Sequence, residues 1–222
     1  MYLTSKDVKN IDSYFIEELG IPEIVLMENA ALKVVKNIDE KSRRIVIICG
    51  TGNNGGDGLA AGRHILCSDK QIVFFVVGSK EKMSSACNIH YNILTNLNVA
   101  INFIENNQDL LKLRNALKTC DLVIDSIFGI GLSREVTDIY KEVIKTINNA
   151  SKCVLAVDVP SGLDVNSGEI HGCCIKANKT VTFIGEKQGF KSIKAKQYLG
   201  EVIVEQISIP EFVTKCIKTN VR

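Results

Sequence analysis

The chain has 222 residues, of which 45% are hydrophobic and 6% aromatic. Its 27 basic and 25 acidic residues leave a net charge of +2, which argues against nucleic acid as the main partner. No apolar run approaches the ~20 residues of a membrane span, and no signal-peptide pattern is visible. These features predict a cytoplasmic protein without a membrane partner. Its eight cysteines, including Cys49 and Cys153 in apolar runs, are expected to be mostly buried, reduced thiols.

The chain opens with two segments of helical periodicity, at 4–19 and 22–38, which Gly20 and Pro22 separate. Thr4 is the expected N-cap of the first helix, with Asp7 three residues on. The apolar stripe of this helix comprises Val8, Ile11, Tyr14, Phe15 and Leu19.

After these helices, short apolar runs alternate with helical patterns. The expected strands are 45–49, 72–77, 101–104, 122–125 and 154–158, and the expected helices are 57–67, 84–97, 109–118 and 138–148. Two more strand-like segments follow, at 180–184 and 201–207. The lysine-rich stretch 187–196 is expected to be a solvated face or loop, and the residues after Pro210 a short polar tail.

Strands that are apolar on both faces are typical of a parallel sheet covered by helices on each side. We therefore predict one α/β domain over residues 1–222, a three-layer α/β/α Rossmann-like sandwich with a mostly parallel central sheet. The two N-terminal helices should pack onto it. In such sheets ligands bind at the carboxyl ends of the strands, where three distinctive sequences occur.

The first of these sequences is GTGNNGGDG, at 50–58, between a strand and a helix. Its five glycines permit close approach of a ligand to the backbone, and the helix N-terminus favours phosphate. The pattern matches GxGxxG, but the next strand ends at Gly78 without the acidic residue that a classical dinucleotide site requires. No Gly-Lys-Ser/Thr follows, so a P-loop is excluded.

The second and third sequences each place an aspartate at the end of an apolar strand. Asp125 begins DSIFGIGLSRE, and a buried carboxylate is costly unless it is paired or bound to a cation. Asp158 lies within VDVPSGLD at 157–164, where its simpler interpretation is a turn former. Because all three motifs follow strands and contain glycine and polar residues, they together predict one ligand-binding crevice at the carboxyl ends of the strands.

These three motifs, with Met27-Glu28-Asn29-Ala30-Ala31, resemble the NAD(P)H-hydrate epimerase family, also called the YjeF N-terminal domain family. The likeness covers nearly the whole chain and implies epimerisation of the R and S forms of hydrated NADH or NADPH, NAD(P)HX. The substrate-binding residues that it implies are Asn53, Asn54, Gly55, Gly56, Asp57, Gly129, Ile130, Gly131, Leu132, Ser133, Arg134, Glu135 and Asp158.

The resemblance also implies a potassium ion held by Asn54, Asp125 and Ser161, whose oxygen atoms suit a hard cation. Asp158 is the main catalytic candidate, as an acid–base group. Lys187 is a second one, although Glu186 precedes it where the family usually has proline. Relatives further imply a homodimer and cooperation with an NAD(P)HX dehydratase, separate or fused.

Three alternatives to an epimerase are considered. A Rossmann-type oxidoreductase is disfavoured by the missing ribose-binding acid. A non-catalytic nucleotide-binding or scaffold module of the same fold is expected to have lost the strand-end motifs. These motifs are present in this sequence, which favours an enzyme. A nucleotide hydrolase lacks a recognisable metal cluster or base.

Overall fold

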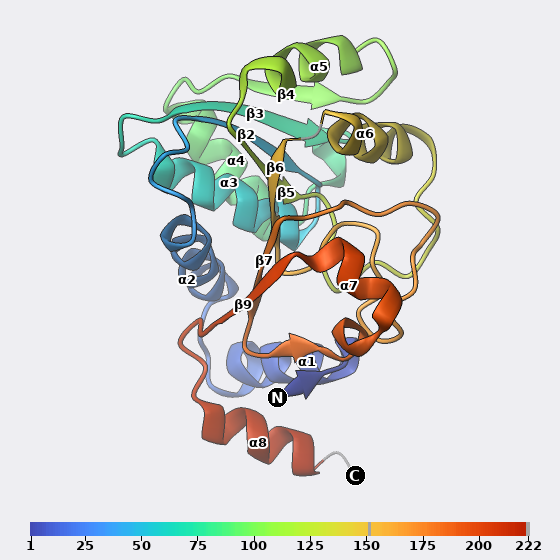
Figure 1. Ribbon diagram of the computed structural model, residues 1–222. Coiled ribbons are helices and arrows are strands. Elements are labelled where there is room, and N and C mark those ends of the chain that lie inside the picture. The colour runs from blue at the N-terminus through green and yellow to red at the C-terminus, as the bar shows by residue number, and fades with distance from the viewer. Residues whose placement is uncertain (151, 221–222) are drawn as a thin grey trace.

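The computed structural model describes residues 1–150 and 152–220, with side chains as far as residue 215. Within these residues, parallel strands form a seven-stranded sheet of order β4-β3-β2-β5-β6-β7-β9 (Figure 1). The strands are β2 (Arg44–Cys49), β3 (Gln71–Val77), β4 (Ile101–Ile104), β5 (Leu122–Ser126), β6 (Cys153–Val157), β7 (Lys179–Phe183) and β9 (Glu201–Glu205).

Helices cover both faces of this sheet, α2 to α4 on one and α5 and α6 on the other (Figure 1). The helices are α1 (Ser5–Ser13), α2 (Glu23–Lys36), α3 (Asn53–Ile65), α4 (Ser85–Asn96), α5 (Leu110–Thr119), α6 (Asp138–Asn149), α7 (Ile193–Leu199) and α8 (Glu211–Asn220). None of the described helices combines the length and apolar character needed to cross a membrane.

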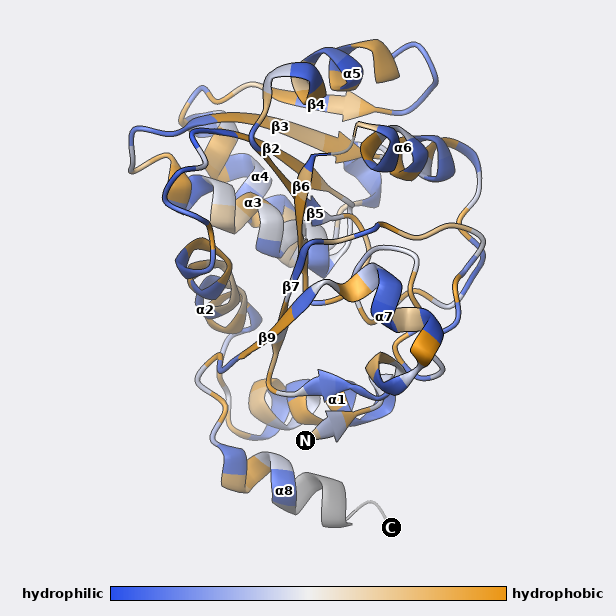
Figure 2. Cartoon of the chain, viewed as in Figure 1, coloured by the Kyte–Doolittle hydropathy of each residue, from blue (hydrophilic) through white to orange (hydrophobic). Residues whose placement is uncertain are grey.

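Alternate residues of each central strand enter two separate cores. In β2, Ile45 and Ile47 pack in the core under α2 and α3, whereas Val46 and Ile48 pack in the core under α5 and α6. All four side chains are at most 1% exposed, and Figure 2 shows the hydrophobic character of β3 along its length. Burial on both faces is the property of parallel strands between helical layers, so the predicted three-layer α/β fold is confirmed.

The strand order reverses between β2 and β5. From β2 the chain continues to β3 and β4 on one side, and then returns to β5, β6, β7 and β9 on the other. The loops that leave β2 and β5 therefore diverge and leave a crevice at the carboxyl ends of these strands. Two of the three predicted motifs follow these two strands, and the third follows the adjacent β6.

The first helix is capped as predicted but is shorter. Thr4 Oγ1 accepts a hydrogen bond from Asp7 N at 3.1 Å, and Asp7 Oδ2 accepts one from Thr4 N at 2.8 Å. A π-helical turn, Tyr14–Glu18, replaces the last part of the expected helix. This turn rotates the following residues, so Leu19 is 49% exposed rather than part of the buried stripe.

The end of the chain is more regular than predicted. The stretch 187–196 is exposed at Lys191, Lys194 and Lys196, as predicted for a solvated face, but Lys187 is buried in β8 (Glu186–Lys187). This strand pairs with β1 (Tyr2–Leu3) and precedes a 3-10 turn (Gln188–Lys191) and α7. Within the predicted polar tail, Glu211–Asn220 form α8, and residues 221–222 lie outside the described part of the chain. Cys49 is buried as predicted, whereas Cys153 is exposed because it begins its strand.

Candidate active site

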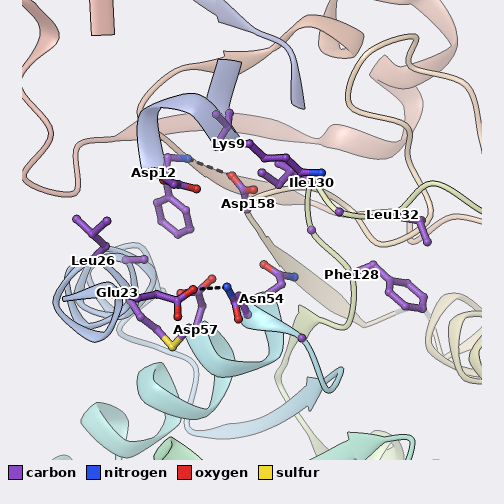
Figure 3. A pocket seen from close by; sticks show the side chains of 18 of the residues that line it. Lys9, Asp12, Glu23, Leu26, Asn54, Asp57, Phe128, Ile130, Leu132 and Asp158 are labelled. Carbon is purple, nitrogen blue, oxygen red and sulfur yellow. Dashed lines mark hydrogen bonds between the residues drawn. The ribbon is translucent and has the colours of Figure 1, made fainter. Parts of the chain in front are cut away.

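A cavity of about 740 Å³ lies at the carboxyl ends of β2, β5 and β6, with α1 and α2 forming its other wall (Figure 3). This volume suits a small-molecule ligand. The predicted site residues that line the cavity are Asn53, Asn54, Asp57, Gly129, Ile130, Gly131, Leu132, Ser133, Arg134, Asp158 and Lys187.

Three of the predicted substrate-binding residues lie outside this lining. A side chain on Gly55 would place its Cβ 1.9 Å from the carbonyl oxygen of Gly50, so this glycine allows α3 to pack on the preceding loop. Gly56 lies against the Met27 side chain, and Glu135 lies against Gly172. The two glycines shape the site, because a side chain at either position would overlap other protein atoms, whereas Glu135 is exposed.

The GTGNNGGDG motif joins β2 to α3, and the helix begins at Asn53, four residues earlier than predicted. Gly50 N donates a hydrogen bond to Ser126 O at 2.9 Å, which ties this loop to the end of β5. Gly52 is the N-cap and supplies no side chain, so the first N–H groups of α3 receive no side-chain cap. A helix N-terminus of this kind at a cavity favours an anionic group of a ligand.

Asp125 and Ser161 meet beneath the cavity, and both are fully buried. Ser161 Oγ donates to Asp125 Oδ1 at 2.6 Å, and Ser161 N donates to Asp125 Oδ2 at 2.8 Å. Burial raises the pKa of Asp125 to about 6, although the hydrogen bonds from Ser161 oppose this rise. Within the described part of the chain, no lysine or arginine pairs with this carboxylate.

The Asn54 side chain is buried beside the same loop. Neither its oxygen nor its nitrogen has a hydrogen-bond partner, and its amide lies against Gly129. The neighbouring Phe128 N donates to Ser161 Oγ at 2.9 Å. An unpartnered buried amide is costly, as is a buried carboxylate without a countercharge. Amide, carboxylate and hydroxyl oxygens together fit a hard cation such as the potassium ion implied by the family.

Asp158 follows β6 and has φ +65°, in the left-handed region that non-glycine residues rarely occupy. Its Oδ1 atom lies 2.7 Å from Lys187 Nζ and accepts a hydrogen bond from Thr182 Oγ1 at 3.2 Å. Lys187 is fully buried and also donates to Phe183 O at 3.1 Å. The structure thus brings the two predicted catalytic residues into one ion pair. No described residue donates a hydrogen bond to the second oxygen of Asp158, Oδ2.

The opposite wall carries residues that were not predicted. Asp12 of α1 lines the cavity near Asp158, and burial and the charge of Asp158 raise the pKa of Asp12 to about 7, with Lys187 opposing. Burial, followed by the charges of Asp158 and Asp12, also raises the pKa of Asp57 well above its usual range. Additional lining residues outside the prediction include Lys9, Glu23, Thr51, Phe128, Tyr140 and Phe183.

A signal for Asp12 was present in the sequence. It lies four residues after Val8 and between Ile11 and Phe15, which are all buried on the inner side of the first helix. A carboxylate on the apolar face of an amphipathic helix needs a reason, because burial of a charge is unfavourable.

A parallel α/β sheet with a polar cavity and a free helix N-terminus at its switch point defines a small-molecule-binding protein of the Rossmann-like class. Residues 23–189 match the family described as YjeF-related protein N-terminus. The chain therefore belongs to this family.

Relatives of known name agree with this assignment. The chain is 35% identical over 215 residues to the NAD(P)H-hydrate epimerase of Oenococcus oeni, covering 95% of this chain and 98% of the relative. It is 37% identical over 226 residues to the bifunctional NAD(P)H-hydrate repair enzyme Nnr of Dictyoglomus turgidum, covering 99% of this chain but only 43% of that relative. The crystal structure of yeast ynu0, YNL200c, shares the fold, with a TM-score of 0.76 and 23% identity over 93% of this chain and 88% of the yeast chain.

Proposed function

We propose that this chain, acting as one domain over residues 1–222, epimerises the R and S forms of NAD(P)HX at C6 of the nicotinamide ring. The observation that carries the proposal is the Asp158–Lys187 ion pair, which holds a carboxylate at the cavity beside the free N-terminus of α3. The Oenococcus oeni relative of similar length is named for this activity.

Inversion at C6 requires the C–O bond to break and to re-form on the opposite face of the ring. As hydroxide departs, the ring nitrogen donates its lone pair and the ring becomes an iminium cation. The carboxylate of Asp158, which Lys187 holds in place, stabilises this cation. The unoccupied Oδ2 atom can accept the proton of the water that adds to C6. Lys187 contacts the carboxylate rather than the substrate, so it acts as a positioning residue.

The substrate is held by the two glycine-rich loops. The first turn of α3, from Asn53 to Asp57, offers N–H groups to the pyrophosphate, and the loop 129–135 closes over it. Arg134 lines the same side of the cavity and supplies a positive charge.

Asn54, Asp125 and Ser161 would hold the potassium ion. The ion would supply the positive charge that the buried carboxylate lacks and an oxygen-binding partner for the Asn54 amide. It would thereby fix the two substrate loops against each other. We further propose that the protein is cytoplasmic, forms a homodimer and works with an NAD(P)HX dehydratase, separate or fused. The longer relatives named as bifunctional NAD(P)H-hydrate repair enzymes support a second activity beside this domain.

The decisive experiment uses a mixture of R and S hydrated NADH with an excess of an S-specific dehydratase. The absorbance of recovered NADH is followed with and without this protein. Consumption of the R half faster than its spontaneous conversion supports the epimerase. Recovery of the S half alone would contradict it and would favour a non-catalytic binding module. The Asp158→Asn variant, which keeps the side-chain shape, should lose the acceleration.

A further inference from the structure

The departing hydroxide requires a proton, and Asp158 is a poor source of it. Its Oδ1 atom lies 2.7 Å from Lys187 Nζ and accepts hydrogen bonds from Thr182 Oγ1 and Phe183 N, so only Oδ2 is left to exchange a proton. The leaving hydroxide and the incoming water lie on opposite faces of the ring, and a single free carboxylate oxygen serves only one of these faces. A second acidic group in the cavity must therefore carry the proton at the start of the reaction.

The cavity offers two further aspartates near the ion pair, Asp12 and Asp57. Figure 3 shows Asp12 near Asp158, whereas Asp57 lies on the other side of the cavity with Glu23 and Asn54.

The surroundings of Asp12 favour its neutral form. The charged groups that act on it are Asp158, Lys187 and Glu23, with Asp57 across the cavity; Lys9 of the same helix also lines the cavity. Among the described residues none donates a hydrogen bond to its carboxylate, and the positive charge of Lys187 is already paired with Asp158. Its pKa of about 7 suits a group that releases and regains a proton at neutral pH. Burial also raises the pKa of Asp57, but this residue lies across the cavity from Asp158 (Figure 3).

We propose that Asp12 is a second catalytic residue, which forms with Asp158 a carboxylate pair that shares one proton and works from two sides of the nicotinamide ring. This inference rests on the proposed epimerase function. Asp12 comes from α1 and Asp158 from the end of β6, so the two side chains reach the cavity from different walls.

The proton and electron movements follow directly. The carboxyl proton of Asp12 passes to the C6 hydroxyl while the C–O bond breaks, and the bonding pair leaves with the oxygen as water. The lone pair of the ring nitrogen forms the C=N bond. A water on the other face then attacks C6 with one of its own lone pairs and gives a proton to Asp158, while the C=N π pair returns to nitrogen. The reverse reaction starts from protonated Asp158 and ionised Asp12, and pocket water resets the pair.

The test measures epimerisation directly, by chromatographic separation of purified R or S substrate over time, with the spontaneous rate subtracted at each pH. Asp12→Asn should lower kcat by roughly 10²–10⁴-fold with KM little changed. The wild-type rate should fall as the pH rises above about 7, where the pair loses its shared proton. Residual activity of Asp12→Asn should not show this fall, and Asp12→Glu should recover part of the rate.

Glu18→Gln is the matched control, because Glu18 is an exposed acid six residues along the same segment, without a described partner. This variant should keep the wild-type rate and pH profile. Wild-type kinetics in Asp12→Asn would overturn the role of Asp12 alone, whereas an inactive wild-type protein would overturn the proposed function as well.

A second measurement tests the proposal even if the Asp12→Asn variant does not fold. Carboxyl-carbon NMR of the free wild-type protein should show Asp12 titrating near pH 7, and Asp158→Asn should lower this pKa by removing the adjacent negative charge. Titration of Asp12 in the ordinary range of an exposed aspartate would overturn the inference.

Discussion

Replacing Lys187 with methionine removes the countercharge of Asp158 while nearly preserving side-chain volume. Lys187 is fully buried, its Nζ atom lies 2.7 Å from Asp158 Oδ1, and the Asp158 side chain is only 12% exposed. Nζ also donates to Thr182 Oγ1 at 2.9 Å and to Phe183 O at 3.1 Å. The variant leaves a largely buried carboxylate without its partner, a change that costs about 3–5 kcal/mol.

For a chain of this length, such a loss corresponds to a fall in the thermal midpoint of roughly 6–20 °C. The assay is urea unfolding of four proteins: wild type, Lys187→Met, Asp158→Asn and the double variant. Asparagine at 158 needs no countercharge, so the double variant should be more stable than Lys187→Met alone. The coupling between the two positions should lie within about 0.5–3 kcal/mol.

An exposed ion pair provides the control for this cycle. Lys194 Nζ lies 3.0 Å from Glu169 Oε1, but the two side chains are 66% and 58% exposed. Lys194→Met should therefore leave the urea midpoint unchanged. A cost below about 1 kcal/mol for Lys187→Met, or strictly additive effects in the double variant, would refute the view that this pair is buried and coupled.

Three further predictions concern the loops, the cation site and pH. Gly55→Ala should cost roughly 1–3 kcal/mol in urea unfolding because its Cβ would overlap the Gly50 carbonyl, whereas Gly52→Ala meets open space and should be neutral. Replacing KCl with choline chloride should lower the wild-type thermal midpoint, and Asp125→Asn should abolish this response; an insensitive wild type contradicts the cation site. The pKa of Asp12 is about 7 in the folded protein and about 3.8 in the unfolded chain. The contribution of its proton to the free energy of unfolding is therefore fully present below pH 3.8 and is lost as the pH rises to about 7. Asp12→Asn should thus gain stability over wild type by at most ~1.4 kcal/mol per pH unit across this window, measured by urea unfolding at several pH values; a gain independent of pH would contradict it.

The sheet and the three strand-end motifs could be predicted because both depend on local patterns. Strands that are apolar on both faces indicated burial between helical layers, and glycine with a polar residue at a strand end indicated a ligand site. The order of the strands could not be obtained from these patterns. It determines that Asp125 and Ser161 meet, although 36 residues separate them along the chain.

Lys187 and Asp12 show where local patterns stop being informative. Lys187 lies in a lysine-rich stretch, and only the pairing of β8 with β1 and its bond to Asp158 turn it inward. Asp12 is one acid in an otherwise ordinary amphipathic helix, and its altered pKa arises from burial and from residues far away in sequence. The character of both groups is set by tertiary neighbours, which a periodicity analysis does not contain.

Several features of the cavity oppose stability. Asp158 has a positive φ, Asn54 has an unpartnered buried amide, and Asp12 faces a like charge. The central sheet tolerates these costs because its strands are held by two apolar cores, one on each face. If a charged side chain serves structure alone, neutralising it should lower the stability of the protein. If Asp12→Asn is instead more stable than wild type above pH 7 and yet epimerises slowly, the carboxylate serves catalysis and lowers the stability of the folded protein.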